Sequence, residues 1–281
     1  MKSFRDKVAV ITGAASGIGR ALGDRCVREG MKVVLADIEE KALTQAETEM
    51  RAAGGSVISV VTDVSNAESI EKLFRKALES FGAVHLLCNN AGIAARVPSI
   101  WESTAADWEW ALGVNLWSVI HGLRIFVPRM LEQDSEGHIV NTASVVGLMV
   151  PPGGATYTVS KHGVVVLSEI LYHELRDRNS KIGVSVLCPG FVNTRIIESE
   201  RNRPDALKNP PDKAVHDAEY ESRVKKSSEA VKSGMSPEQL ADAVFDAIRN
   251  EKFYILTHPE FNEKIRIRTE SILAGSNPVR A

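Results

Sequence analysis

A strand, a glycine-rich turn and a helix follow one another directly near the start of the chain. The β-branched run at residues 7–12 leads into Gly13-Ala-Ala-Ser-Gly-Ile-Gly19, and a helical apolar pattern then continues to Gly30. Glycines allow a tight turn and close approach to the backbone, and a helix N-terminus offers unpaired N–H groups to an anion. Alone, this Gly-x-x-x-Gly-x-Gly spacing would also suit a structural turn. Between a strand and a helix, it predicts a binding site for the pyrophosphate of a dinucleotide.

The alternation of strands and helices continues along the chain. Strands are predicted at residues 7–12, 32–36, 56–62, 85–88, 137–142, 183–188 and 253–256. Helices are predicted up to residue 30 and at residues 39–53, 66–81, 104–133 (with a bend near Pro128), 156–177, 214–231, 236–250 and 261–273. Repeated βα units imply an α/β fold, with one doubly wound parallel sheet of about seven strands and helices on both faces. Because no repeat or linker interrupts the pattern, residues 1–281 are predicted to form a single domain.

Several candidate site residues directly follow predicted strands. They are Gly13, Asp37, Asp63, Asn90, Ser144 and Pro189. Ligands of such sheets bind beyond the carboxyl ends of the strands, so these residues are expected to converge on one site.

Asp37 ends the second predicted strand, 18 residues after Gly19. A carboxylate there can accept hydrogen bonds from both ribose hydroxyls of an adenosine and would repel a 2′-phosphate. A helix N-cap at Asp37 is compatible with this role. Ser16 and Ile38 add no positive charge nearby, so NAD is expected and NADP is less favoured.

Tyr157 and Lys161 are four residues apart, which places them on one helix face if a helix starts near Thr156. A free phenol has a pKa of about 10. A cation beside it favours the phenolate and lowers that pKa, and a general acid–base works best when its pKa lies near the operating pH. The spacing alone is common on exposed helices. Together with the predicted nucleotide site, it indicates a proton-transfer pair.

The charge balance argues against some classes of partner. The chain has 34 basic and 36 acidic side chains and a net charge of -2, so no nucleic-acid or membrane partner is expected. Residues 1–7 are too polar for a signal peptide. The 3 cysteines lack a Cys-x-x-Cys spacing and are expected to be reduced core thiols in a cytoplasmic protein.

Taken together, these motifs resemble the short-chain dehydrogenase/reductase family in its compact single-domain branch. The matching segments, in chain order, are residues 12–19, residues 89–92, Asn115, Ser144, residues 157–161 and residues 189–194. Ala143 is a departure, because many members carry a second serine there. The resemblance implies a Rossmann-type fold and hydride transfer between a nicotinamide cofactor and a CH–OH group. It also implies a homodimer or homotetramer built on the two long helices.

The resemblance further implies roles for individual residues. Tyr157 would be the acid–base, Lys161 would lower its pKa and hold the nicotinamide ribose, Ser144 would bond the substrate oxygen, and Asn115 would anchor a water in a proton relay. The other implied cofactor-binding residues are Gly13, Ser16, Gly17, Ile18 and Gly19 around the pyrophosphate, Asp37 and Ile38 at the adenosine ribose, Asp63 and Val64 at the adenine, Asn90, Ala91 and Gly92 along the cofactor, and Pro189, Gly190, Val192 and Thr194 toward the carboxamide.

The expected substrate wall is apolar. Residues 145–155 and Phe191 are rich in Val, Leu, Met, Pro and Gly and include no Arg or Lys, although Arg195 lies close by in the sequence. A bulky, mainly hydrophobic secondary alcohol or ketone is therefore predicted as the substrate. Residues 193–235, which are highly charged and interrupted by prolines, are predicted to form a substrate-binding lid, and a solvated excursion is the alternative.

Two other classes of function stay open. A nucleotide-sensing protein without catalysis could keep this fold, although Tyr157, Lys161 and Ser144 are all present. An epimerase or dehydratase on the same scaffold would usually have a longer chain and a different glycine spacing.

The tryptophans and histidines add little to the site. All 4 tryptophans (Trp101, Trp108, Trp110 and Trp117) lie at the start of the long predicted helix. They are expected to pack in the core or at a subunit contact rather than to form a ligand platform. No metal site is predicted, because His162 and His173 would lie roughly 16 Å apart along one helix.

Overall fold

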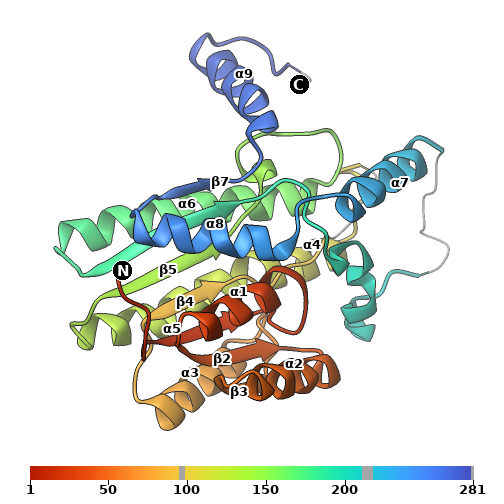
Figure 1. Ribbon diagram of the computed structural model, residues 1–281. Coiled ribbons are helices and arrows are strands. Elements are labelled where there is room, and N and C mark those ends of the chain that lie inside the picture. The colour runs from red at the N-terminus through yellow and green to blue at the C-terminus, as the bar shows by residue number, and fades with distance from the viewer. Residues whose placement is uncertain (95–98, 211–217, 280–281) are drawn as a thin grey trace.

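The computed structural model describes residues 1–94, 99–210 and 218–279, and its centre is a parallel sheet (Figure 1). Seven strands pair in the order β3-β2-β1-β4-β5-β6-β7, and each neighbouring pair is parallel. The strands are β1 (Val8–Thr12), β2 (Lys32–Asp37), β3 (Ser56–Val61), β4 (Leu86–Asn89), β5 (Gly137–Thr142), β6 (Ile182–Cys188) and β7 (Tyr254–Leu256). This confirms the predicted doubly wound sheet. The strand order reverses between β1 and β4, which opens a crevice at the carboxyl ends of these strands.

Helices cover both faces of the sheet (Figure 1). They are α1 (Gly17–Arg28), α2 (Glu40–Ala52), α3 (Ala67–Phe81), α4 (Ala105–Leu112), α5 (Ser118–Glu132), α6 (Ala155–Asp177), α7 (Ala218–Lys232), α8 (Pro237–Arg249) and α9 (Asn262–Leu273). Side chains alternate between the two faces along each strand. Leu35 of β2 therefore packs in the core beneath α1, α2 and α8. Its neighbour Val34 packs in the opposite core, beneath α3, α5 and α6.

The start of α3 and the start of α8 follow from capping residues. Asn66 Oδ1 accepts hydrogen bonds from the backbone N–H groups of Glu68 and Ser69, which are otherwise unpaired at a helix start. Ser236 and Gln239 form a reciprocal capping box at the start of α8. Both starts agree with the sequence prediction.

The long predicted helix at residues 104–133 differs in detail. It consists of α4, a π-helical turn at Gly113–Trp117 and α5. Pro128 lies inside α5, and the change in hydrogen-bond pattern is at the π turn instead. A π turn inserts one extra residue and commonly marks a functional site. Here it carries Asn115, whose side chain is fully buried.

The described residues contain one run, 105–132, that is long and apolar enough to cross a membrane by length and composition alone. In the fold this run is α4, the π turn and α5, which pack against α3 and α6. A core helix of a soluble protein passes the same test.

The C-terminal part of the chain contributes α7, α8, β7 and α9. The first part of the predicted helix at residues 214–231 lies outside the described residues, and α7 begins at Ala218. The last helix, α9, projects beyond β7 from the edge of the molecule (Figure 1), and none of its residues is buried.

Candidate active site

A cleft of about 670 Å³ lies at the carboxyl ends of the strands. All of the predicted site residues line it except Gly19, Asn115 and Ser144, which lie directly behind its wall. The sheet therefore brings together segments from β1 to β6, as the positions of the motifs predict.

The glycine-rich turn between β1 and α1 fits a pyrophosphate. Gly13 and Gly17 have φ values of 67° and 54°, which favour glycine. At Gly19 a Cβ atom would lie 2.1 Å from the Gly13 carbonyl oxygen and 2.6 Å from Asn90 Nδ2, so only glycine fits. Asn90 fixes the turn by donating from Nδ2 to the Thr12 carbonyl oxygen at 3.0 Å. The turn thus places the N-terminus of α1 beside the cleft, where its N–H groups can bind an anion.

The end of β2 fits an adenosine ribose. Asp37 Oδ2 accepts from Ala15 N at 2.9 Å, and Oδ1 accepts from Glu39 N at 3.0 Å. These bonds fix the carboxylate, and each oxygen keeps a further lone pair for a hydroxyl group. Asp63, at the end of β3, accepts from the backbone N–H and hydroxyl of Ser65 at 2.9 and 2.6 Å. The Asp63 carboxylate therefore shapes the wall of the predicted adenine site.

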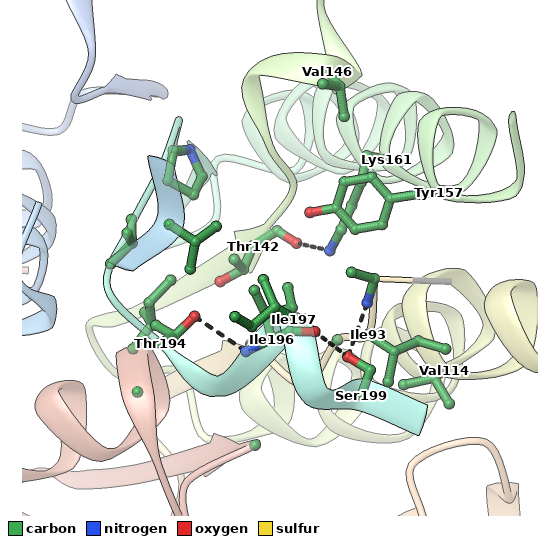
Figure 2. A pocket seen from close by; sticks show the side chains of 18 of the residues that line it. Ile93, Val114, Thr142, Val146, Tyr157, Lys161, Thr194, Ile196, Ile197 and Ser199 are labelled. Atoms are coloured by element: carbon green, nitrogen blue, oxygen red, sulfur yellow. Dashed lines mark hydrogen bonds between the residues drawn. The ribbon is translucent and has the colours of Figure 1, made fainter. Parts of the chain in front are cut away.

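Tyr157 and Lys161 lie one turn apart on α6 and both line the cleft. Figure 2 shows both side chains reaching from α6 toward the segment that carries Ile196 and Ile197. Lys161 Nζ lies 5.7 Å from the centroid of the Tyr157 ring and donates to the Thr142 carbonyl oxygen at 2.9 Å. The ammonium is therefore beside the ring of Tyr157.

The net shift of the Tyr157 pKa is opposite to the direction expected from a neighbouring cation alone. Burial raises the pKa of the Tyr157 phenol, and a hydrogen bond with the Ser144 hydroxyl opposes that effect. Burial also lowers the pKa of the Lys161 ammonium to about 8. Desolvation disfavours the charged form of each group, and it is the largest cause of both shifts.

Ser144 and Asn115 support the pair from behind the cleft wall. Ser144 follows β5, and its hydroxyl donates to the Pro189 carbonyl oxygen at 3.3 Å. Asn115 Oδ1 accepts from Ile93 N at 2.8 Å, and its Nδ2 donates to the Ile93 carbonyl oxygen and to Ser160 Oγ at 3.0 and 3.2 Å. Asn115 therefore fixes Ile93 against α6.

Asn115 also lies close to Lys161. A Cβ atom at Gly92 would lie 3.3 Å from Asn115 Oδ1 and 3.4 Å from Lys161 Nζ. The two polar groups thus face the same small residue at the end of β4, as a proton relay between them would require.

The loop after β6 crosses the cleft toward the glycine-rich turn. A Cβ atom at Gly17 would lie 2.9 Å from Thr194 Cγ2, so the two loops are in close contact. His258 orders this loop, because its Nδ1 accepts from Gly190 N and its Nε2 bonds the Phe191 carbonyl oxygen, each at 3.0 Å. His258 lies outside every sequence motif described above, so no local pattern predicts this role.

The remaining cleft wall is mostly apolar. The predicted wall residues Val146, Met149, Pro151, Pro152 and Phe191 all line the cleft. The structure adds Ile93, Trp110, Val114, Ile196, Ile197, Val224 and Phe261. Trp110 is buried in a small core cluster, as expected for the tryptophans, and it also lines the cleft. Trp101 and Trp117 are exposed.

Three basic side chains in the cleft lining also lie outside the predicted site. Arg201 comes from the 3-10 segment η3 (Arg195–Asn202), Arg223 from α7 and Lys264 from α9. No motif marks these residues, because each reaches the cleft only through the tertiary fold.

Proton transfer at the Tyr157 hydroxyl is the chemistry that this arrangement supports. Ser144 can hold an oxygen atom beside that hydroxyl, and apolar side chains form much of the cleft wall. Lys161 keeps a positive charge near the phenol, which favours the phenolate as a proton leaves. A bound nicotinamide ring would supply the hydride acceptor or donor.

Comparisons with known proteins agree with this geometry. The short chain dehydrogenase family matches residues 7–205. A crystal structure of a short chain dehydrogenase/reductase from Burkholderia phymatum, in complex with NAD, is 48% identical and has a TM-score of 0.95, covering 99% of this chain and 98% of that chain. The CLA biosynthesis dehydrogenase/reductase of Lactiplantibacillus plantarum is 36% identical over 99% of this chain and 97% of its own. The 1-deoxy-11-beta-hydroxypentalenate dehydrogenase of Streptomyces exfoliatus is 32% identical over 95% of this chain and 88% of its own.

These matches cover the sheet, the glycine-rich turn and the Tyr157–Lys161 pair, and they confirm the resemblance inferred from the motifs. They also favour catalysis over nucleotide sensing, since the similar proteins are dehydrogenases or reductases. The chain belongs to the short-chain dehydrogenase/reductase family and is an oxidoreductase that acts on CH–OH groups with a nicotinamide cofactor.

Proposed function

We propose that the protein transfers a hydride between NAD and a bulky, mainly hydrophobic secondary alcohol or its ketone. The observation that carries this proposal is the surrounding of Tyr157. The acid–base faces a cleft lined by Val146 from the loop after β5 and by Ile196 and Ile197 from η3 (Figure 2). Such walls stabilise apolar substrate surface by about 25 cal/mol per Å² removed from water. A small polar alcohol would gain little from them.

The adenosine end of the cleft supports NAD over NADP. Its carboxylates are those of Asp37 at the end of β2, Glu39 just after β2, and Asp63 just after β3. A 2′-phosphate beside Asp37 would be repelled by like charge. The similar structure from Burkholderia phymatum holds NAD, which agrees with this preference.

A basic side chain lines the substrate end of the cleft. Lys264 lies one turn after Phe261, whose ring is 6.1 Å from that of Phe191. The nearby carboxylates of α9, Glu263 and Glu270, both pair with Arg266. Lys264 therefore contributes a positive charge to this end of the cleft. A hydrophobic alcohol that also carries a carboxylate would therefore fit, and the name of the Streptomyces exfoliatus enzyme's substrate describes a hydroxylated acid.

A substrate panel tests the reaction. NADH formation from NAD is measured with bulky aryl, alicyclic and terpenoid secondary alcohols and with small polar alcohols. We expect turnover with the bulky set. Turnover confined to small polar alcohols would contradict the proposed substrate class, and no turnover with any of them would weigh against the proposed reaction.

The proposed recognition of a substrate carboxylate by Lys264 is tested with matched pairs of substrates. Medium-chain hydroxy acids are compared with their methyl esters in the wild-type enzyme and in Lys264→Met. The variant should raise the KM of the acids about tenfold and leave the KM of the esters unchanged, because a hydrogen bond to a charged group contributes about 1.5–3 kcal/mol. Lys225→Met is the control, since Lys225 is exposed on α7 and does not line the cleft. Equal loss for acids and esters would exclude carboxylate recognition by Lys264.

We also propose that the predicted lid at residues 193–235 moves mainly at α7. The first part of this segment is tied down, because Ser199 Oγ accepts from Ala94 N at 3.0 Å and Arg203 pairs with Asp107 at 2.7 Å in a buried site. In contrast, α7 faces the cleft with one stripe of side chains, from Tyr220 to Val231. Residues 211–217 lie outside the described residues. Hydrogen exchange at residues 218–232 should slow when a substrate analogue joins NAD, and no change would favour a solvated excursion.

A homo-oligomer built on the long helices is proposed on similar grounds. Val159, Val166 and Ile170 share one exposed face of α6, and Trp117 is exposed at the π turn. Such a patch suits contact with a second copy of the chain. Light scattering should report a dimer or tetramer for the wild type and a smaller species for Val166→Glu. A wild-type monomer would contradict the proposal.

A further inference from the structure

A carboxylate and a guanidinium from distant parts of the chain meet at the adenosine end of the cleft. Glu39 follows β2, and Arg201 belongs to η3. Arg201 donates from Nε and Nη2 to Glu39 Oε1 at 3.1 and 2.5 Å, and Asn202 Nδ2 donates to the same oxygen at 3.0 Å. Arg195 adds a second guanidinium, with Nη1 3.8 Å from Glu39 Oε2. These four residues all line the cleft.

The contact is between fixed and fully charged groups. Arg201 Nη1 donates to the carbonyl oxygens of Arg195 and Glu198 at 3.1 and 2.9 Å, so the guanidinium is held on both sides. Its hydrogen bonds to Glu39 are the main reason that the pKa of that carboxyl is lowered. Glu39 is therefore ionised at neutral pH, and it balances positive charge that would otherwise face the cleft.

The Glu39–Arg201 ion pair lies next to Asp37, whose carboxylate fits the adenosine ribose. The backbone N–H of Glu39 donates to Asp37 Oδ1 at 3.0 Å, so Asp37 and Glu39 belong to one tight turn. Guanidinium groups are well suited to bind phosphates, and a nearby arginine is how dinucleotide sites of this fold accommodate a 2′-phosphate. Arg201 and Arg195 are thus cations capable of binding a phosphate at the end of the cleft where a 2′-phosphate would lie.

We propose that Glu39 is a second residue that sets the preference for NAD, and that it acts through Arg201. By pairing with Arg201 and Arg195, Glu39 keeps both guanidiniums from binding a 2′-phosphate. This inference rests on the proposed preference for NAD. It adds a second cause of that preference. Asp37 repels the 2′-phosphate directly, whereas Glu39 acts by pairing with the arginines of η3.

The test is a binding cycle that needs no turnover. Dissociation constants for NAD and NADP are measured for the wild type, Glu39→Gln, Arg201→Met and the double variant. Gln keeps a hydrogen-bond acceptor at position 39 and removes the charge. We expect Glu39→Gln to tighten NADP binding about tenfold, because a charged hydrogen bond contributes about 1.5–3 kcal/mol. NAD binding should stay within about twofold, and the gain for NADP should disappear in the double variant.

Glu49→Gln is the matched control. It removes a carboxylate of α2, the helix that follows Glu39, and this carboxylate pairs with Arg20 at 2.8 Å outside the cleft. It should leave both dissociation constants unchanged. If the ratio of the NADP to the NAD dissociation constant is the same in Glu39→Gln as in the wild type, the proposed role of Glu39 is overturned. A gain for NADP that persists in the double variant would show that the effect does not pass through Arg201. A wild type that binds NADP as tightly as NAD would overturn both the proposed preference and this inference, whereas failure of the alcohol panel alone would leave the inference standing.

Discussion

The ammonium of Lys161 donates to the carbonyl oxygen of Thr142 across 2.9 Å, at the carboxyl end of β5. The Lys161 side chain is almost completely buried, and burial lowers its pKa to about 8. The fold therefore holds a charged amine in an unfavourable environment at neutral pH. The buried Lys161 ammonium lies beside Tyr157, where it can favour the phenolate when a proton is released.

The first prediction is that Lys161→Met stabilises the fold at neutral pH. The Lys161 pKa is lower in the folded state than its value of about 10.4 in an unfolded chain. The penalty is therefore fully present below about pH 8 and is lost as the pH rises toward the unfolded pKa. Removing the buried charge should raise the free energy of unfolding by on the order of 3 kcal/mol. Loss of the hydrogen bond to Thr142 should offset about 1 kcal/mol of this gain.

Urea unfolding at pH 7 and at pH 10 checks this prediction. The variant should be more stable at pH 7, and its advantage should shrink by pH 10. Lys181→Met, at an exposed position paired with Asp134, is the control and should show no such pH dependence. An advantage that is the same at both pH values would contradict the burial argument.

The glycine-rich turn gives a steric prediction. In Gly19→Ala the new Cβ atom would lie 2.1 Å from the Gly13 carbonyl oxygen, so the turn must shift. We expect a loss of about 1–3 kcal/mol in the free energy of unfolding, typical of overpacking, together with weaker NAD binding. Gly113→Ala is the control, since its Cβ atom would meet only Ser65 at an ordinary 3.4 Å. If Gly19→Ala binds NAD like the wild type, the turn does not hold the pyrophosphate as described.

Removing the Asp37 charge should narrow the preference for NAD. Asp37→Asn keeps one acceptor for the backbone N–H groups of Ala15 and Glu39, so the loop should be retained better than in Asp37→Ala. The ratio of kcat/KM for NAD to that for NADP is expected to fall about tenfold or more in either variant, because charged hydrogen bonds to the ribose are lost and repulsion of the phosphate is relieved. An unchanged ratio would exclude Asp37 as a determinant of cofactor choice.

The sequence was sufficient to predict those site residues that belong to a local motif at the end of a strand. Gly13, Asp37 and Asn90 each end or directly follow a strand whose end faces the cleft, and a parallel sheet gathers such ends at one edge. The order of the motifs therefore predicted both the sheet and most of the cleft.

Other features depend on contacts that no local pattern records. Glu39 and Arg201 meet although they are 162 positions apart, and Lys264 reaches the cleft from the last helix. The π turn at Asn115 depends on hydrogen bonds to Ile93 and Ser160. The direction of the Tyr157 pKa was mispredicted because four-residue spacing indicates a nearby cation but not the extent of burial.

The most direct test of the whole account is the rate of NADH formation by Tyr157→Phe with the best alcohol of the panel, measured beside the NAD dissociation constant. Loss of the hydroxyl should slow turnover by about 10²–10⁴-fold, the usual contribution of general acid–base catalysis. NAD binding should change by less than about twofold. Tyr254→Phe, whose hydroxyl bonds Glu169 outside the cleft, should keep full activity. Turnover by Tyr157→Phe close to that of the wild type would contradict the role of Tyr157 as the acid–base.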